Sequence, residues 1–177
     1  MKNSRLKAKS ATFKITLTAV LFAITLVLSL VENMLPPVII GVPGLRLGLS
    51  NIIVMFCIFY LDSTLAIFIA VLKSFFVFLM RGFVAAVLSL CGGVVSAVLM
   101  IILIAIFKDK ISIFLLSVLG AITHNFFQIV AIMIIMQNFY FIFYTPVLVI
   151  FGIVSGTITA TILNQINKNL KIKELLK

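Results

Sequence analysis

Several polar side chains lie in apolar sequence, where a membrane or a protein core would surround them. They are Arg46, Asn51, Lys73, Arg81, His124, Asn125 and Gln128. The whole chain has one histidine, two cysteines and four acidic residues, so few groups are present for hydrolytic, redox or metal chemistry. Cations and amides without acids predict binding of a ligand through charge and hydrogen bonds, not catalysis.

Two of the cations fall on one apolar segment. Lys73 lies near the middle of residues 65–80, and Arg81 follows eight residues later. Eight residues of helix are just over two turns and roughly 12 Å, so both cations share a face. A lysine inside a span costs about 2.5–3.5 kcal/mol on insertion scales, so it usually faces a cavity or a partner. Snorkelling of Lys73 toward the interface is the alternative.

The stretch "GVPGLRLGLSN" places an arginine in a turn. Pro43 and Gly44 predict a turn that re-enters the outer membrane face, and Asn51 lies one turn into the next apolar segment. Arg46 is then predicted at the mouth of a pocket, on the same side as Arg81. Binding of lipid phosphates by both arginines is the alternative.

A third polar group lies in "GAITHNFFQIV". His124 and Gln128 are four residues apart and share a helix face, with Asn125 about 100° round from His124. Hydrogen bonds between helices and contacts with a ligand both remain open for this group. A metal role for His124 is disfavoured because no second histidine or acid lies at ligand spacing.

The composition is that of an integral membrane protein. Of 177 residues, 64% are hydrophobic and 10% are charged, whereas a soluble domain carries about a quarter charged residues. Basic residues crowd both ends beside apolar runs. The positive-inside rule therefore predicts cytoplasmic tails at 1–14 and 167–177, and nucleic-acid binding is disfavoured.

Six apolar segments predict an all-α integral membrane protein with a single six-helix membrane domain at 15–166. The segments are 15–31, 48–61, 65–80, 83–107, 111–136 and 146–166. Several approach the roughly 20 residues that cross a bilayer core, and the second is short. An even number of spans agrees with two cytoplasmic ends, and Lys108 and Lys110 then fall inside as well. The predicted location is the plasma membrane of a prokaryotic cell.

The acidic residues all fall at span ends or in loops: Glu32, Asp62, Asp109 and Glu174. Without an embedded carboxylate, proton or sodium coupling by this chain is disfavoured. No G-x-x-x-x-G-K-[ST] loop is present, so the chain is not expected to hydrolyse ATP. The isolated cysteines predict neither a disulfide nor a metal site, and no cofactor is expected to bind this chain.

Small residues recur at four-residue spacing. Gly152 and Gly156 form "GIVSG", "GGVVSA" repeats the pattern, and Ala19 and Ala23 lie on one face of the first span. Such pairs let helices approach closely. Internal packing is the leading interpretation, and an interface with a partner is the alternative.

A small six-span protein with basic tails, an A-x-x-x-A in its first span and no ATP site resembles the substrate-binding S component of an energy-coupling factor (ECF) transporter. "PGLRLGLSNI", "LCGGVVSAVLM" and "GAITHNFFQ" are similar to hallmark segments of the Gx transporter family, whose members often carry the name heptaprenyl diphosphate synthase component I. The resemblance covers residues 15–165. An arginine is usual in that family where this chain has Lys73, which keeps the charge without a bidentate grip.

The resemblance implies an S-component bundle of six helices with a substrate pocket near the outer face. It also implies a membrane-embedded T subunit, against which Ala19 and Ala23 dock, and two ATPase subunits that use ATP to power uptake. Prenyl-chain elongation needs clustered aspartates to hold Mg²⁺ and diphosphate, and this sequence has none. The chain is therefore expected not to be an enzyme.

The leading hypothesis is a binding and translocating subunit for a small molecule. Three cations without a nearby acid favour an anionic substrate that is vitamin-like or related to isoprenoids or quinones. A membrane accessory protein of prenyl or quinone metabolism is the second hypothesis, and a stand-alone channel is the third.

Overall fold

The structure, a computed structural model, describes residues 11–34, 48–107 and 111–169. Within these ranges the chain is helical and contains no strand. The helices are α1 (Ala11–Met34), α2 (Asn51–Tyr60), α3 (Ser63–Arg81), α4 (Phe83–Phe107), α5 (Ile113–Met136), the 3-10 helix η2 (Phe139–Tyr144) and α6 (Thr145–Asn169).

Five of the described helical segments are long and apolar enough to cross a membrane. They comprise α1, α3, α4, α5 and the run Phe139–Ile166. α2 has 10 residues, which at 1.5 Å per residue is about half of a roughly 30 Å bilayer core. The prediction of an all-α, multi-pass membrane protein is confirmed, whereas the count of six spans and the cytoplasmic ends stay predictions.

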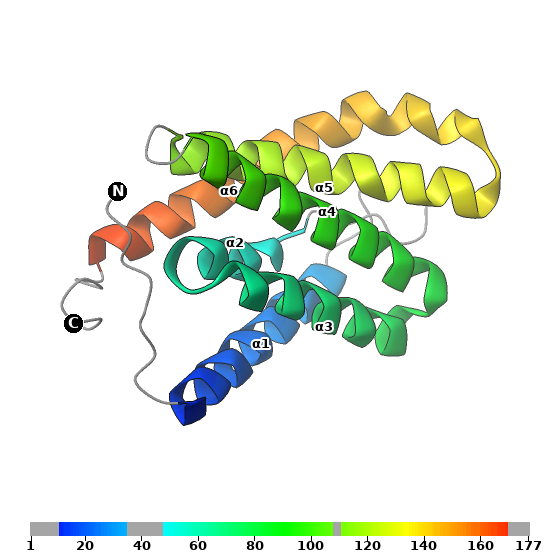
Figure 1. Ribbon diagram of the computed structural model, residues 1–177. Coiled ribbons are helices and arrows are strands. Elements are labelled where there is room, and N and C mark those ends of the chain that lie inside the picture. The colour runs from blue at the N-terminus through cyan, green and yellow to red at the C-terminus, as the bar shows by residue number, and fades with distance from the viewer. Residues whose placement is uncertain (1–10, 35–47, 108–110, 170–177) are drawn as a thin grey trace.

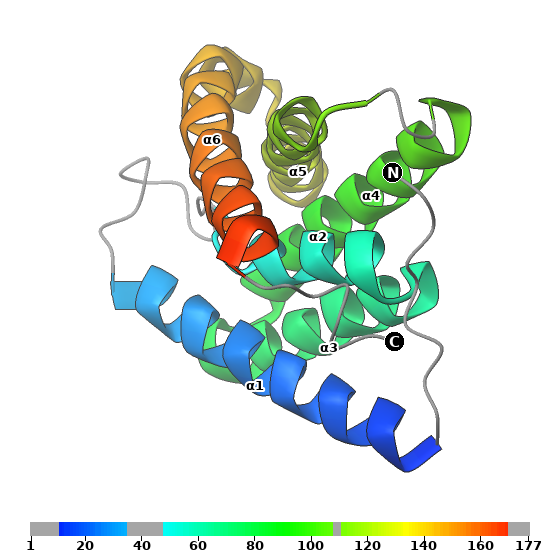
Figure 2. The ribbon, with the colours of Figure 1, turned by 90° about the vertical axis from the view of Figure 1, so that its left-hand side faces the viewer.

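The helices form a bundle in which α3, α4, α5 and α6 pack in chain order (Figure 1). α1 and α2 pack against α3, and α1 lies at the edge of the bundle (Figure 2). The α2/α3 turn lies at the same end of the bundle as the first residue of α1 and the last residue of α6. The α3/α4 turn and η2 lie at the opposite end.

Local chemistry explains where the helices begin and end. The Asp62 side chain accepts a hydrogen bond from the Thr64 N–H at 3.4 Å, and Ser112 Oγ accepts one from the Leu115 N–H at 3.1 Å. These bonds satisfy N–H groups that lack partners within the helix. The break predicted at Asp62-Ser63-Thr64 is therefore confirmed. α3 ends at Arg81 and is followed by Gly82, whose φ of +84° suits glycine.

The small residues of α6 serve internal packing. A Cβ at Gly156 would lie 2.6 Å from Val118 Cα, and one at Gly152 would lie 3.1 Å from Ile122 Cα. The α6 stripe therefore packs directly against the backbone of α5. The leading interpretation of these small residues is confirmed for this stripe.

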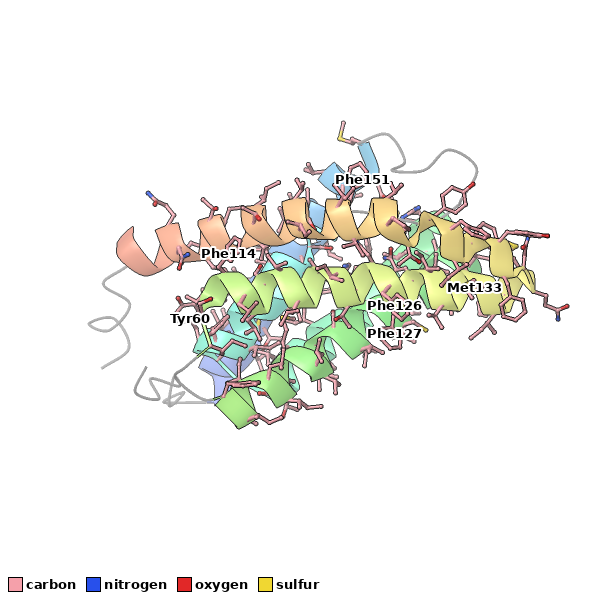
Figure 3. The ribbon with its side chains drawn as sticks, turned by 90° about the horizontal axis from the view of Figure 1, so that it is seen from above. Tyr60, Phe114, Phe126, Phe127, Met133 and Phe151 are labelled. Atoms are coloured by element: carbon pink, nitrogen blue, oxygen red, sulfur yellow. The ribbon has the colours of Figure 1, made fainter. Side chains whose placement is uncertain are left out.

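The outer surface of the bundle is apolar, as helices that face lipid require. Large hydrophobic side chains are exposed along all the long helices. In Figure 3, Tyr60 and Phe114 mark one end of the bundle and Met133 lies toward the other. Phe126 and Phe127 lie between them on α5, with ring centroids 5.7 Å apart in an edge-to-face pair. An apolar exterior leaves the polar side chains to gather inside.

Candidate functional site

A small cavity lies between α1, α3, α4 and α5, beside the turn that precedes α2. Four of the side chains predicted from sequence line it: Lys73, Arg81, His124 and Gln128. Its volume is about 20 Å³, which is room for about one water molecule. The bundle thus brings together residues from two distant segments of the chain into one polar site.

α3 contributes the cations of the site. Lys73 is 5% exposed, and its ammonium donates a hydrogen bond to Asn51 Oδ1 at 3.2 Å. Arg81 is partly buried and lines the same cavity two turns along α3. Lys73 therefore faces the protein interior and does not snorkel. Asn51 enters the site through its contact with the lysine.

α5 contributes a hydrogen-bonded pair. His124 and Gln128 are both buried, and the nitrogens His124 Nε2 and Gln128 Nε2 lie 3.0 Å apart. An amide N–H that donates to the ring nitrogen requires that nitrogen to be unprotonated. Gln128 Oε1 has no hydrogen-bond partner among the described residues. A buried acceptor beside the cavity is suited to receive a hydrogen bond from a ligand.

Asn125 lies apart from the cavity. Its side chain is buried, and its Nδ2 donates to the backbone carbonyl of Leu148 on α6 at 3.0 Å. Because Asn125 follows His124 directly in the helix, its side chain lies about 100° round the helix axis from His124 and contacts α6 instead of the cavity. Of the two roles that the sequence left open for this group, Asn125 has the contact between helices. Arg46, the remaining predicted residue, lies outside the described residues.

Two glycines make room for His124. Gly48 has a φ of +79°, and a Cβ there would lie 3.1 Å from both Asn51 Nδ2 and His124 Cδ2. In α4, a Cβ at Gly92 would lie 2.8 Å from the His124 carbonyl oxygen and 2.9 Å from its Nδ1. Glycine at these two positions therefore lets the turn before α2 and helix α4 pack closely against His124.

Glu32 is the site residue that sequence reasoning missed. It is 4% exposed in the last turns of α1, lines the cavity, and accepts a hydrogen bond from the Gly48 N–H. Its carboxylate also interacts electrostatically with the Lys73 ammonium. The interpretation that the cations have no acid nearby is therefore wrong. The last turns of a helix can be buried when neighbouring elements cover them, and here Gly48 and α3 do so.

A signal for Glu32 is present in the sequence of α1. Thr25, Ser29 and Glu32 are spaced by four and three residues, and all three are buried. Polar residues at that spacing lie on one helix face, so they mark the inward face of α1. The position of Glu32 at the end of a span does not indicate its burial, whereas its helical phase does.

Ala19 and Ala23 lie on the exposed surface of α1. Neither contributes to the cavity, which begins further along the same helix. The two residues are accessible on the edge helix of the bundle, as a docking surface requires.

Comparison with known proteins gives one family. The family described as heptaprenyl diphosphate synthase component I matches residues 21–166, which is most of the chain and all of the cavity. The match includes the three segments on which the resemblance was based, and the expected family is confirmed. Neither a curated protein nor a solved structure gives a match.

Proposed function

Since the chain belongs to the heptaprenyl diphosphate synthase component I family, we propose that it is the substrate-binding S component of an ECF-type uptake transporter. The observation that carries this proposal is the polar cavity inside an otherwise apolar bundle. Burying Lys73 and Glu32 in such a bundle opposes folding unless both charges are well compensated. Charges kept at that cost in a membrane protein commonly mark a substrate path.

The proposed substrate is a small compound with an anionic group. Lys73 and Arg81 place two cations against one carboxylate in the described part of the cavity. The site therefore offers net positive charge to a ligand, with Gln128 Oε1 as an acceptor for a hydrogen-bond donor. A vitamin-like compound or a carboxylated or phosphorylated isoprenoid or quinone precursor has both kinds of group.

Binding of such a compound requires the helices to separate. Ligand pockets usually have volumes of about 300–1,000 Å³, whereas this cavity has a volume of about 20 Å³. In the proposed cycle this conformation is a closed one. α1 is the helix placed to move, because it lies at the edge of the bundle and packs mainly against α2 and α3.

The partners we propose are a membrane-embedded T subunit and two ATPase subunits. The exposed Ala19 and Ala23 on α1 support a close helix–helix contact with the T subunit, since small side chains let helices approach. The ATPases use ATP, and this chain binds no cofactor and performs no chemistry in the scheme. Its place is the plasma membrane.

Co-purification and transport test this function together. The tagged chain should capture a membrane subunit and two ATPases, and vesicles that hold the whole complex should take up the compound found with the purified protein by mass spectrometry. Uptake should require ATP. Flux through vesicles that contain this chain alone would identify a channel instead.

The family description supports a second candidate, a membrane accessory of prenyl metabolism. In that case the tagged chain should capture a soluble prenyl synthase and no ATPases. The absence of an aspartate cluster from the sequence supports assigning any prenyl-transfer chemistry to such a partner.

A further inference from the structure

Glu32 occupies the position in the cavity that an anionic ligand would need. Its carboxylate accepts the Gly48 N–H and interacts with the Lys73 ammonium, and Arg81 lines the same cavity. A backbone N–H and cationic side chains are the groups that proteins use to hold carboxylates and phosphates. In this conformation the protein supplies the anion itself.

Among the described residues, the cavity leaves no space for a second anion beside Glu32. A volume of about 20 Å³ accepts a water molecule, but not an additional carboxylate or phosphate group. An anionic ligand can reach Lys73 only if a side chain or a helix moves. Glu32 is the group with the matching charge, and it lies near the end of the edge helix α1 (Figure 2).

We propose that Glu32 is an internal occupant of an anion-binding position and that the carboxylate or phosphate of the ligand takes its place beside Lys73. The inference rests on the proposed function for its view of the cavity as a substrate site. Glu32 would then determine specificity. Lys73 loses the nearby carboxylate when the ligand binds, and only a negatively charged group of the ligand replaces that charge. It also links binding to α1, the helix that carries Ala19 and Ala23.

Replacement of Glu32 by alanine tests this position without knowledge of the natural ligand. In Glu32→Ala the buried Lys73 loses the carboxylate that interacts with it, so Tm should fall on the order of 10 °C. Acetate fits the space and the charge that the side chain leaves. Acetate should restore at least half of the lost Tm, and acetamide at the same concentration should not.

The controls separate this effect from general salt stabilisation. Asp62→Ala removes an exposed carboxylate that also accepts a backbone N–H, so its lower Tm should not respond specifically to acetate. In the double variant Glu32→Ala/Lys73→Met acetate should have no effect, because the cation is gone. Equal responses to acetate and acetamide, or a response that survives Lys73→Met, would overturn the proposal.

A second variant covers the case in which Glu32→Ala does not fold. Glu32→Gln fills the same volume and keeps an acceptor for the Gly48 N–H. It should gain more Tm from inorganic phosphate or acetate than the wild-type protein does. A gain no larger than that of the wild type contradicts the proposal, since Gln competes with an anion less well than Glu.

Nanodiscs distinguish a soluble anion from a lipid headgroup. Glu32→Ala should be equally destabilised in phosphatidylcholine and in phosphatidylglycerol, and acetate should restore it in both. Restoration by phosphatidylglycerol alone would overturn the assignment to a soluble ligand. None of these measurements involves ATPases or uptake, so they test the anion-binding position independently of the transport function.

Discussion

At the scale of single residues, the site is defined by which polar groups find partners within the protein. Asn51 pairs with Lys73, and Asn125 pairs with the Leu148 carbonyl. Gln128 Oε1 and Asn125 Oδ1 both lack such a partner in the described ranges 11–34, 48–107 and 111–169. An unsatisfied buried acceptor is costly, and of the two amides only Gln128 lines the cavity, so Gln128 is the one that we expect to meet a ligand.

This difference predicts opposite phenotypes for the two amides of α5. Asn125→Ala removes a hydrogen bond between α5 and α6 and should lower stability by about 1 kcal/mol, or about 2–4 °C in Tm, with uptake retained. Gln128→Ala should lower uptake by reducing substrate affinity, with a smaller change in Tm. Thermal unfolding in detergent and substrate titration of uptake measure both effects. If only Asn125→Ala lost substrate affinity, the assignment of the ligand contact to Gln128 would be wrong.

At the scale of elements, the turn before α2 connects the end of α1 to the site. Gly48 donates its N–H to Glu32, and its positive φ places Asn51 at the start of α2 next to Lys73. The helix of 10 residues that follows is shorter than a bilayer crossing. α2 thus positions polar groups within the bundle as well as filling its interior.

Two glycines with positive φ make a matched pair for this element. Gly48→Ala adds backbone strain of about 1–2 kcal/mol and brings a Cβ against Asn51 and His124. Gly82→Ala adds at least as much strain, because φ +84° with ψ −178° is a conformation that essentially only glycine adopts, but no atom lies within 4 Å of its Cβ position. Both variants should have a lower Tm, and only Gly48→Ala should reduce uptake. Reduced uptake in both would mean that backbone strain alone explains the effect.

The exposed face of α1 predicts an effect on coupling. Ala23→Trp places a large side chain on the surface proposed to contact the T subunit. It should abolish uptake and spare binding of the compound that co-purifies. Ile150→Trp adds the same bulk to an exposed position of α6 and should leave uptake intact. If binding and uptake fall together in Ala23→Trp, the docking surface is wrongly assigned.

At the scale of the whole molecule, the helices place alternate connections at opposite ends of the bundle. The α2/α3 turn lies at the end where α1 begins, and η2 lies at the other end (Figure 1). A six-span protein with cytoplasmic tails must then have the α2/α3 turn inside the cell and η2 outside. The aromatic side chains of η2 would lie at the outer interface, where tyrosine is favoured.

Cysteine labelling in intact cells tests this orientation. In a background with Cys57 and Cys91 replaced by alanine, Phe139→Cys should react with a membrane-impermeant maleimide. Asp62→Cys should react only after the cells are opened, because its turn faces the cytoplasm. The side chains of Phe139 and Asp62 are both exposed in the structure. The reverse labelling pattern would contradict the predicted orientation and the cytoplasmic tails.

The sequence by itself determined the features that depend on local chemistry and helical period. Composition indicated a membrane protein, capping chemistry indicated the helix start after Asp62, and four-residue spacing placed His124 with Gln128. Tertiary structure alone decided which helix each polar face meets. Glu32, Gly48 and Lys73 are 16 and 25 residues apart in sequence, and only the packing of α1 and α2 against α3 makes them neighbours. The net charge of the site depends on that packing, because electrostatic interactions depend on the distance between charges in space and not on their separation in sequence. The charge of the ligand that we propose depends on it as well.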